Sequence, residues 1–311
     1  MQFREIISGL GFLEGPTILQ DGRLVVTDVE HGILVAVDPA SGRTQTLAET
    51  KGGPNGAALG PDGYLYVVNN GGMAFASHNG FKGGDPNGVP VSVAPPGVQR
   101  VGLNGEVTQL YTECDGRPLL RPNDIVFDAH GGFYFTDTGR ADDRLADLGG
   151  LYYAKADGSA IVELVHNARP HLPLTQPNGV GLSPDGTVVY VSETGHGRLS
   201  SWKVLAPGEL SEEKPRVSHG PSGAMFDSLA VDADGNVCVA TLELGGITVF
   251  SPEGTIIEFV EIPVYDSHVT NICFGGPDLD VAYITSAGRG AIWELTEFRT
   301  GLRLNYQSDG A

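Results

Sequence analysis

Six acidic or amide residues occupy one equivalent position in a pattern that repeats along the chain. They are Glu14, Asn55, Asn123, Asn178, Asp227 and Asn271. Carboxylate and amide oxygens favour a hard cation such as Ca²⁺, with Mg²⁺ or Mn²⁺ as smaller competitors, whereas soft metals favour Cys or His. Without a cation, clustered carboxylates would repel one another in a partly desolvated site. If the fold gathers these residues, their chemistry predicts a site for a divalent cation.

The competing interpretation is that these side chains cap turns and strand ends, since Asn and Asp readily bond to their own backbone. For one isolated Pro-Asn-Gly sequence, that interpretation is the stronger one. Six copies in register instead favour a shared site.

The elements that position these residues follow from the same repeat. Seven residues after each polar position we expect a turn, at Asp21, Asp62, His130, Asp185, Asp234 and Asp278. Gly follows in five of these turns, and Leu279 takes its place in the last one. An apolar segment begins ten residues after each polar position, at residues 24, 65, 133, 188, 237 and 281. This is a repeat of short strand, tight turn and strand.

The polar positions are 41, 68, 55, 49 and 44 residues apart, which matches four-stranded blades with insertions of variable length. Such short sheets cannot bury both faces alone, so the copies must stack radially around an axis. We therefore predict an all-β fold, a six-bladed β-propeller whose innermost strands line a central metal-containing channel. Residues 1–311 are expected to form a single domain.

Composition agrees with this fold and limits the partners. With 45 Gly and 20 Pro in 311 residues, and no long apolar periodicity of 3.6 residues, the chain is typical of an all-β protein. The formal charge of −19 makes nucleic acid and anionic membranes poor partners, because phosphate binding needs clustered Lys and Arg.

Cysteine usage and the chain start bear on the compartment. Cys114, Cys238 and Cys273 have no paired spacing, so they indicate neither a disulfide framework nor a zinc site. The first residues lack a signal-peptide pattern, and no apolar run is long enough to span a bilayer. A soluble cytoplasmic protein is therefore expected, and its oligomeric state is open.

The longest interval between polar positions contains residues 70–97, in which Gly, Pro, Asn and Ser dominate. A loop of this length is either a flexible surface insertion or a flap over one mouth of the channel, and both interpretations stay open. The insertions at 141–148 and 205–215 are polar and indicate surface connections.

Several motifs together resemble one known family. They are Leu-Glu-Gly-Pro at 13–16, Arg-Pro-Asn-Asp at 121–124, Gln-Pro-Asn-Gly at 176–179, Phe-Asp-Ser at 226–228, Val-Thr-Asn at 269–271 and Phe-Gly-Gly at 274–276. In this order they resemble the senescence marker protein 30, gluconolactonase and luciferin-regenerating enzyme family, over almost the whole chain. The resemblance implies a six-bladed propeller with one divalent cation in its channel, and many members of the family hydrolyse lactones.

The resemblance also implies roles for individual residues. Glu14, Asn178 and Asp227 match cation ligands of the family, and Asn123 matches a residue that ligates the ion in some members. Arg121 and Asn123 match the pair that meets the substrate, and Asp227 also matches the general base. The cation implied is Ca²⁺, with Mg²⁺, Mn²⁺ or Zn²⁺ as alternatives. The implied partner is a small-molecule lactone, and the implied reaction is its hydrolysis. In this reaction the cation would polarise the lactone carbonyl, and Asp227 would activate the attacking water.

Departures from the family pattern bear on the substrate. Ser228 follows Asp227, where Gly is frequent in the sugar lactonases. This weakens the case for a polyhydroxylated aldonolactone. Tyr134, Phe135 and residues 73–75 would form an apolar mouth if they lay there, although packing in the core or at the surface is their default interpretation.

Other catalytic signatures are absent from the sequence, including a Gly-x-Ser-x-Gly elbow and a His-Glu-x-x-His motif. Three alternatives to a lactonase use the same site. It could belong to a phosphotriesterase-like hydrolase, to a carbon–carbon hydrolase or hydratase, or to a non-catalytic propeller with structural calcium. His171 and His268 lie near channel positions and could act as acids, but ordinary loop histidines are more common.

Overall fold

The computed structural model describes residues 1–78, 80–141, 146–147, 149–166 and 174–307. Most of the polar insertion at 141–148 and all of His171 lie outside these residues. Within the described chain, the only helical element is the 3₁₀ turn η1 (Ala287–Arg289), and the remaining elements are strands. No helix in these residues is long and apolar enough to cross a membrane.

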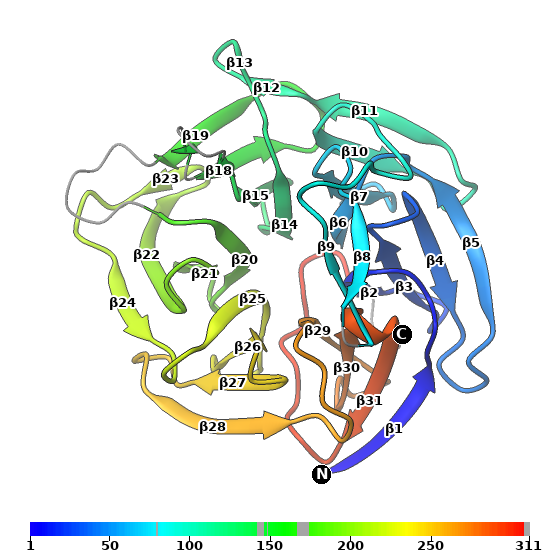
Figure 1. Cartoon of the computed structure of the whole chain (residues 1–311). Helices are drawn as coiled ribbons and strands as arrows, with labels where there is room; N and C mark the ends of the chain where they lie inside the picture. Colours follow the sequence, from blue (N-terminus) through cyan, green and yellow to red (C-terminus); the bar gives the residue numbers. More distant parts are fainter. Residues whose placement is uncertain (79, 142–145, 148, 167–173, 308–311) are drawn as a thin grey trace.

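Six antiparallel sheets surround a central axis, which confirms the predicted six-bladed propeller (Figure 1). Each blade is given from its inner to its outer strand. Blade 1 is β2 (Leu13–Ile18), β3 (Leu24–Asp28), β4 (Ile33–Val37) and β5 (Thr44–Glu49). Blade 2 is β6 (Pro54–Leu59), β7 (Leu65–Asn69), β10 (Gly97–Val101) and β11 (Val107–Tyr111). Blade 3 is β14 (Pro122–Phe127), β15 (Gly132–Asp137), β18 (Gly150–Lys155) and β19 (Ile161–His166).

Blade 4 is β20 (Pro177–Leu182), β21 (Val188–Glu193), β22 (Arg198–Ala206) and β24 (Arg216–His219), with β23 (Glu209–Leu210) paired to the end of β22. Blade 5 is β25 (Met225–Val231), β26 (Val237–Leu242), β27 (Gly246–Phe250) and β28 (Ile256–Glu261). Blade 6 is β29 (Val269–Gly275), β30 (Val281–Ser286), β31 (Ala291–Thr296) and β1 (Gln2–Ile7). Small two-stranded ribbons lie outside the blades, at β12 (Glu113–Cys114) with β13 (Arg117–Pro118) and at β16 (Arg140–Ala141) with β17 (Ala146–Asp147).

The turn between the first two strands of a blade has a local cause in the Asp-Gly sequence. In blade 1 the Asp21 carboxylate accepts a hydrogen bond from the backbone N–H of Arg23, at 3.1 Å. The intervening Gly22 has a φ of +81°, which a residue without a Cβ adopts at little cost. The second strand then begins at Leu24, as predicted.

The propeller is closed by the N-terminal strand, because β1 supplies the outer strand of blade 6 and pairs with β31. The segment after β31 then crosses one end of the channel. Leu302 N–H donates to the carbonyl of Val231 in blade 5 at 3.1 Å, and the Asn305 amide donates to the carbonyl of Phe127 in blade 3 at 3.0 Å. Leu302 and Leu304 line a channel cavity of about 90 Å³. Access to the channel from this end is therefore restricted.

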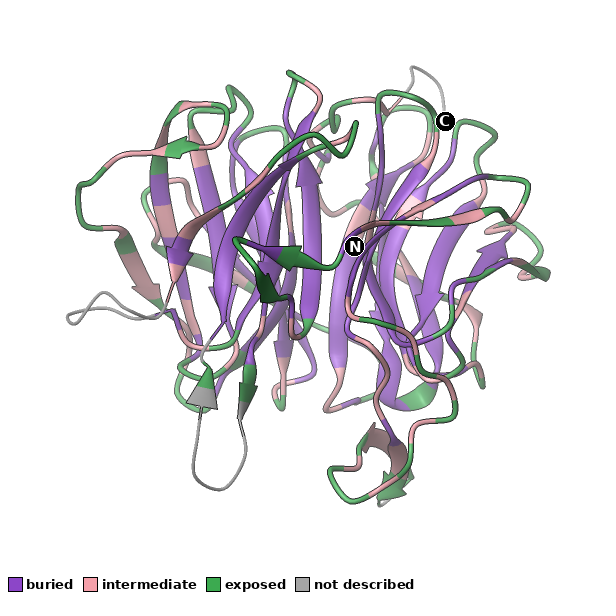
Figure 2. Cartoon of the chain, turned by 90° about the horizontal axis from the view of Figure 1, so that it is seen from above, coloured by how far each residue is buried: buried purple, intermediate pink, exposed green. Residues whose placement is uncertain are grey.

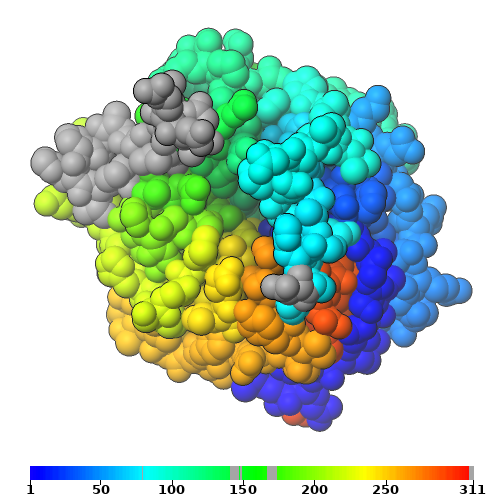
Figure 3. Space-filling model, in the orientation of Figure 1, coloured from blue at the N-terminus to red at the C-terminus, as the bar shows by residue number. Residues whose placement is uncertain are grey.

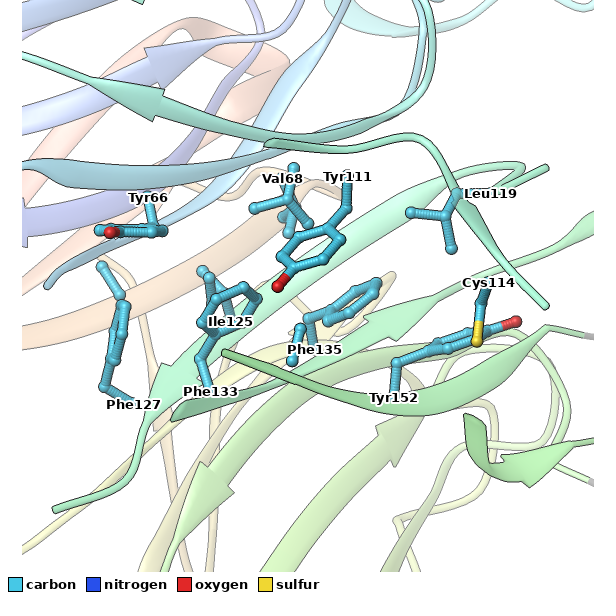
Figure 4. Packing of buried hydrophobic residues seen from close by; sticks show 13 residues of the cluster. Tyr66, Val68, Tyr111, Cys114, Leu119, Ile125, Phe127, Phe133, Phe135 and Tyr152 are labelled. Carbon is cyan, nitrogen blue, oxygen red and sulfur yellow. The ribbon is translucent and has the colours of Figure 1, made fainter. Parts of the chain in front are cut away.

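The hydrophobic core lies between neighbouring blades. Blades 2 and 3 share a cluster rich in aromatic residues, in which Tyr66 meets Phe127 edge-on with ring centroids 5.0 Å apart and Phe135 stacks on Tyr152 at 5.1 Å (Figure 4). Phe135 is fully buried in this cluster, and Tyr134 is buried in the cluster between blades 3 and 4. Both side chains therefore belong to the core and do not form the channel mouth.

Residues 70–97 contain a hairpin, β8 (Phe75–His78) and β9 (Phe81–Gly84), which leaves blade 2 and docks on other blades. Phe75 stacks on Phe12 with ring centroids 4.7 Å apart, and Phe12 meets the ring of His268 at 5.7 Å. Phe81 meets Tyr265, in the connection to blade 6, at 5.9 Å. Figure 3 shows the hairpin in cyan, reaching over blade 1 toward blade 6. The hairpin projects from one face of the disc (Figure 2).

Candidate active site

Each of the six predicted polar residues lies near the start of the inner strand of its blade, and all are buried. The exposed fractions are 2% for Glu14, 7% for Asn55, 8% for Asn123, 7% for Asn178, 6% for Asp227 and 5% for Asn271. Pairing between the first and second strands shifts register at this level in every blade. Such bulges change the direction of a side chain, here at one end of the channel. The end with the polar residues is opposite to the end crossed by Leu302.

Hydrogen bonds join polar residues of different blades. The Asn271 amide of blade 6 donates to Glu14 Oε2 of blade 1, at 3.0 Å. Val180 N–H of blade 4 donates to Asp124 Oδ2 of blade 3, at 3.1 Å. The Ser228 hydroxyl of blade 5 lies 3.4 Å from Asn178 Oδ1 of blade 4. The fold therefore brings these side chains together from distant parts of the sequence.

Three carboxylates are buried in this network, and burial opposes their ionisation. Burial raises the pKa of Glu14 well above its ordinary value, and the nearby charge of Asp227 adds to this effect. Burial also raises the pKa of Asp227 to about 8, although a hydrogen bond from Asn178 opposes the shift. Asp124, which follows Asn123 and was not singled out by its spacing, has its pKa raised by burial to about 7. The group therefore favours either protons or a cation.

The six polar residues form a polar ring at one end of the channel, called the ring below. Two of its amide oxygens have no hydrogen-bond partner within the described residues. They are Oδ1 of Asn55 and Oδ1 of Asn123, and both atoms are buried. Asn271 differs, because its Oδ1 accepts the N–H of Ile272 at 2.8 Å and its amide N–H₂ is occupied by Glu14. A buried acceptor without a donor is costly, and a cation would satisfy it. The donor set of carboxylate and amide oxygens therefore fits a hard divalent cation.

Arg121 lies at the channel mouth, two residues before Asn123. Its backbone N–H donates to Asp137 Oδ1 at 2.8 Å, whereas its side chain is exposed and has no partner among the described residues. The guanidinium is therefore free to meet a ligand. His268 lies in the loop before β29, where its ring contacts Phe12.

A second column of polar residues, which the sequence pattern alone did not single out, holds the loops that lead into the ring. At the end of the second strand, Asp28, Asn69, Asp137 and Glu193 accept hydrogen bonds from backbone N–H groups two or three residues before the ring position. The signal in the sequence was a second acidic or amide residue, 14 or 15 positions after the first in four blades. These residues therefore fix the backbone of the loops that lead to the polar residues at the mouth of the channel.

A different group of potential metal-binding side chains, Asp28, Glu30 and His31, lies beside the hairpin. Glu30 pairs with Lys82 of the hairpin. Asp28 accepts hydrogen bonds from His31 Nδ1 at 2.9 Å and from Gly11 N–H at 3.2 Å. A cation here would have to displace these partners, so the channel is the better site.

Glycine follows the polar residue in three blades, because the next inner strand approaches closely there. A Cβ on Gly15 would fall 2.2 Å from the carbonyl oxygen of Asn55, and one on Gly179 would fall 2.7 Å from Cα of Ser228. Distances below 3.0 Å cannot be accommodated without a shift of the backbone. The Glu-Gly and Asn-Gly sequences therefore reflect the tight spacing of the ring.

Replacement of Gly15 by Ala is expected to destabilise the protein more than a strained turn alone would. Gly15 and Gly22 both have positive φ, at +48° and +81°, but a Cβ added at Gly22 would have no atom within 4 Å. Gly22→Ala should cost about 1 kcal/mol of unfolding free energy, and Gly15→Ala about 1–3 kcal/mol more. Urea denaturation of both variants measures the difference. Equal losses would contradict the close approach of blades 1 and 2.

Comparison with known proteins places the chain in a family. A family model described as the SMP-30/gluconolactonase/LRE-like region matches residues 12–288. Among curated proteins, lactonase drp35 of Staphylococcus epidermidis is 28% identical over 266 residues, which cover 82% of this chain and 70% of that protein. The chain therefore belongs to the SMP-30/gluconolactonase/LRE-like family, which confirms the resemblance of its motifs. Its likeness to proteins named lactonase supports the expectation of a lactonase.

Solved structures agree with the fold. A gluconolactonase from Xanthomonas campestris has a TM-score of 0.74 at 20% identity, over 94% of this chain and 89% of that one. Regucalcin, a calcium-binding protein from Agrobacterium tumefaciens, has a TM-score of 0.73 at 21% identity, over 97% of this chain and 98% of that one. At these identities the likeness shows the propeller fold alone.

Proposed function

We propose that this protein hydrolyses the ester bond of a lactone with a divalent cation bound in its channel. One observation carries the proposal. The carboxylates of Glu14, Asp124 and Asp227 are buried together, and no Lys, Arg or His side chain within the described residues forms an ion pair with any of them. Buried like charges without a counter-charge are unfavourable, and a cation would remove this cost.

Glu14, Asn123, Asn178 and Asp227 would hold the cation. Their oxygens suit Ca²⁺, and Mg²⁺, Mn²⁺ or Zn²⁺ are alternatives that binding measurements would separate. The buried oxygens of Asn123 and Asn55, for which the described part of the chain supplies no hydrogen-bond donor, support this assignment. When bound, the cation would polarise the lactone carbonyl and stabilise the negative charge that develops on its oxygen.

The side chains of the site would carry the remaining steps. Asp227 would accept a proton from the attacking water as the water oxygen bonds to the carbonyl carbon of the lactone. The C–O bond of the lactone ring then breaks, and the departing alkoxide takes up the proton that Asp227 accepted, which gives a hydroxy acid and restores the carboxylate of Asp227. Arg121, whose planar guanidinium has no partner among the described residues, would hold an oxygen of the substrate, and Asn123 would lie beside it.

The β8–β9 hairpin would act as a flap at the channel mouth and would supply an apolar wall. Phe75 and Phe12 support this role, because their stacked rings are only partly buried and Phe12 precedes Glu14 by two residues. A mouth bounded by aromatic rings favours a lactone with apolar substituents over a polyhydroxylated one.

The proposal is tested with a panel of sugar lactones and apolar lactones, assayed by proton release before and after chelation. We expect turnover that chelation abolishes and Ca²⁺ restores, with higher kcat/KM for apolar lactones. Unchanged turnover in protein shown by elemental analysis to be free of metal would exclude the proposed chemistry. Calcium binding without turnover of any lactone would instead favour a structural ion.

A further inference from the structure

Two fully buried hydroxyl groups connect neighbouring blades at the level of the ring. Thr136 Oγ1, in β15 of blade 3, accepts the N–H of Asp124 at 3.1 Å and donates to the carbonyl of Asn178 in blade 4. Ser192 Oγ, in β21 of blade 4, accepts the N–H of Gly179 at 2.8 Å and donates to the carbonyl of Asp227 in blade 5. Each hydroxyl therefore bridges two blades.

The two bridges act on the residues proposed to bind the cation. The first runs from the residue after Asn123 to Asn178, and the second runs from the residue after Asn178 to Asp227. Three of the four proposed ligands thus belong to one continuous chain of hydrogen bonds. Thr194 adds to it, because its hydroxyl accepts the Asn178 amide at 3.1 Å and donates to the carbonyl of Phe226 at 2.7 Å.

The propeller fold does not itself require a hydroxyl at this position. In blades 2 and 5 the corresponding residues of the second strand are Val68 and Ala240, and both are fully buried. Blade 1 has Thr27, whose hydroxyl donates to the carbonyl of Asn55 in the next blade at 2.7 Å. The bridges are therefore a feature of particular blades, and two of them link adjacent donors of the candidate site.

We propose that Thr136 and Ser192 are positioning residues of the cation site, an inference that rests on the proposed cation-dependent function. The ionised carboxylates of Glu14, Asp124 and Asp227, which are the forms that bind a cation, repel one another and tend to separate the inner strands until the cation is bound. The hydroxyl bridges oppose that separation through the backbone of Asn178 and Asp227. They keep the oxygen donors at the spacing that a cation needs, so less binding energy is spent on ordering them.

Calorimetric titration of metal-free protein with Ca²⁺ tests this role. Thr136→Val and Ser192→Ala reproduce the residues that blades 2 and 5 already carry. We expect each to raise the Kd for Ca²⁺ at least tenfold, and Thr136→Ser and Ser192→Thr, which keep the hydroxyl, to restore binding. The double variant should raise the Kd by less than the product of the single effects, because both bridges act on Asn178.

The matched control is Thr248→Val in blade 5. Thr248 is equally buried, and its hydroxyl pairs with that of Thr241 at 2.8 Å within the same blade. This variant should lower the melting temperature of metal-free protein about as much as the test variants, with an unchanged Kd. A Kd within twofold of the parent protein in Thr136→Val and Ser192→Ala would overturn the positioning role. Failure of the parent protein itself to bind Ca²⁺ would overturn the cation site as well.

Discussion

Replacement of Asp227 by Asn should reduce the kcat for lactone hydrolysis by about 10²–10⁴-fold, the usual contribution of a general base. Asn has nearly the same shape but cannot accept a proton from water at neutral pH. The backbone of residue 227 keeps its hydrogen bond from Ser192, so the strand should remain in place. The rate of proton release at saturating Ca²⁺ and saturating lactone measures the loss.

A buried carboxylate outside the ring provides the control. Asp128 accepts hydrogen bonds from His130 N–H, Gly132 N–H and the Tyr153 hydroxyl, at the opposite end of β14. Asp128→Asn should lower the melting temperature and leave kcat within a few-fold of the parent protein. Full activity in Asp227→Asn would mean that Asp227 is not the general base, and Asp124 would then be the next carboxylate to test.

The spacing of residues was sufficient to predict the ring but not its internal pairing. Glu14, Asn55 and Asn271 occupy the same position in the sequence repeat because the blades are equivalent and each inner strand starts at the same height along the axis. Sequence could not separate their roles. Asn271 donates to Glu14 and is satisfied, whereas Asn55 Oδ1 has no partner among the described residues, and this difference arises from contacts between blades.

Asp124 illustrates a second limit. It follows Asn123 in the sequence, and no other blade has an acidic residue at the equivalent position. Three of the other five blades have Gly there, at residues 15, 56 and 179, because of close packing. Its role depends on Val180 N–H of the adjacent blade, which donates to its carboxylate. No local pattern contains that information, because the two residues are 56 positions apart.

The hairpin at residues 75–84 was hidden for a different reason. Its strands are only four residues long, and the second ends in two Gly, so neither apolar alternation nor strand propensity distinguishes the hairpin from a loop. The docking of Phe75 on Phe12 and of Phe81 on Tyr265 orders it through contacts with other blades. Tertiary packing thus determined the structure of a segment whose sequence predicted only an insertion.

Affinity for Ca²⁺ should rise with pH through the range in which the ring carboxylates ionise. In the metal-free protein burial raises the pKa of Asp124 to about 7 and that of Asp227 to about 8, from an ordinary value of 3.8. A cation binds the ionised forms, so protons must leave as it enters. We expect the Kd to fall up to about tenfold per pH unit for each proton released between pH 6 and 8. Titration at pH 7 in two buffers with different ionisation enthalpies counts these protons.

Folding stability of the metal-free protein should change in the opposite direction. A carboxyl group whose pKa is raised in the folded state binds more protons there than in the unfolded chain, so the free energy of unfolding falls as pH rises. The penalty is absent below the ordinary pKa, grows between about pH 4 and 8, and is complete above pH 8. Metal-free protein should therefore melt at a lower temperature at pH 9 than at pH 6, and Ca²⁺ should raise the melting temperature more at pH 9. Asp227→Asn removes one of the titrating groups, so the melting temperature of the metal-free variant should depend less steeply on pH. An unaltered slope in that variant would mean that the ring carboxylates do not cause the pH dependence.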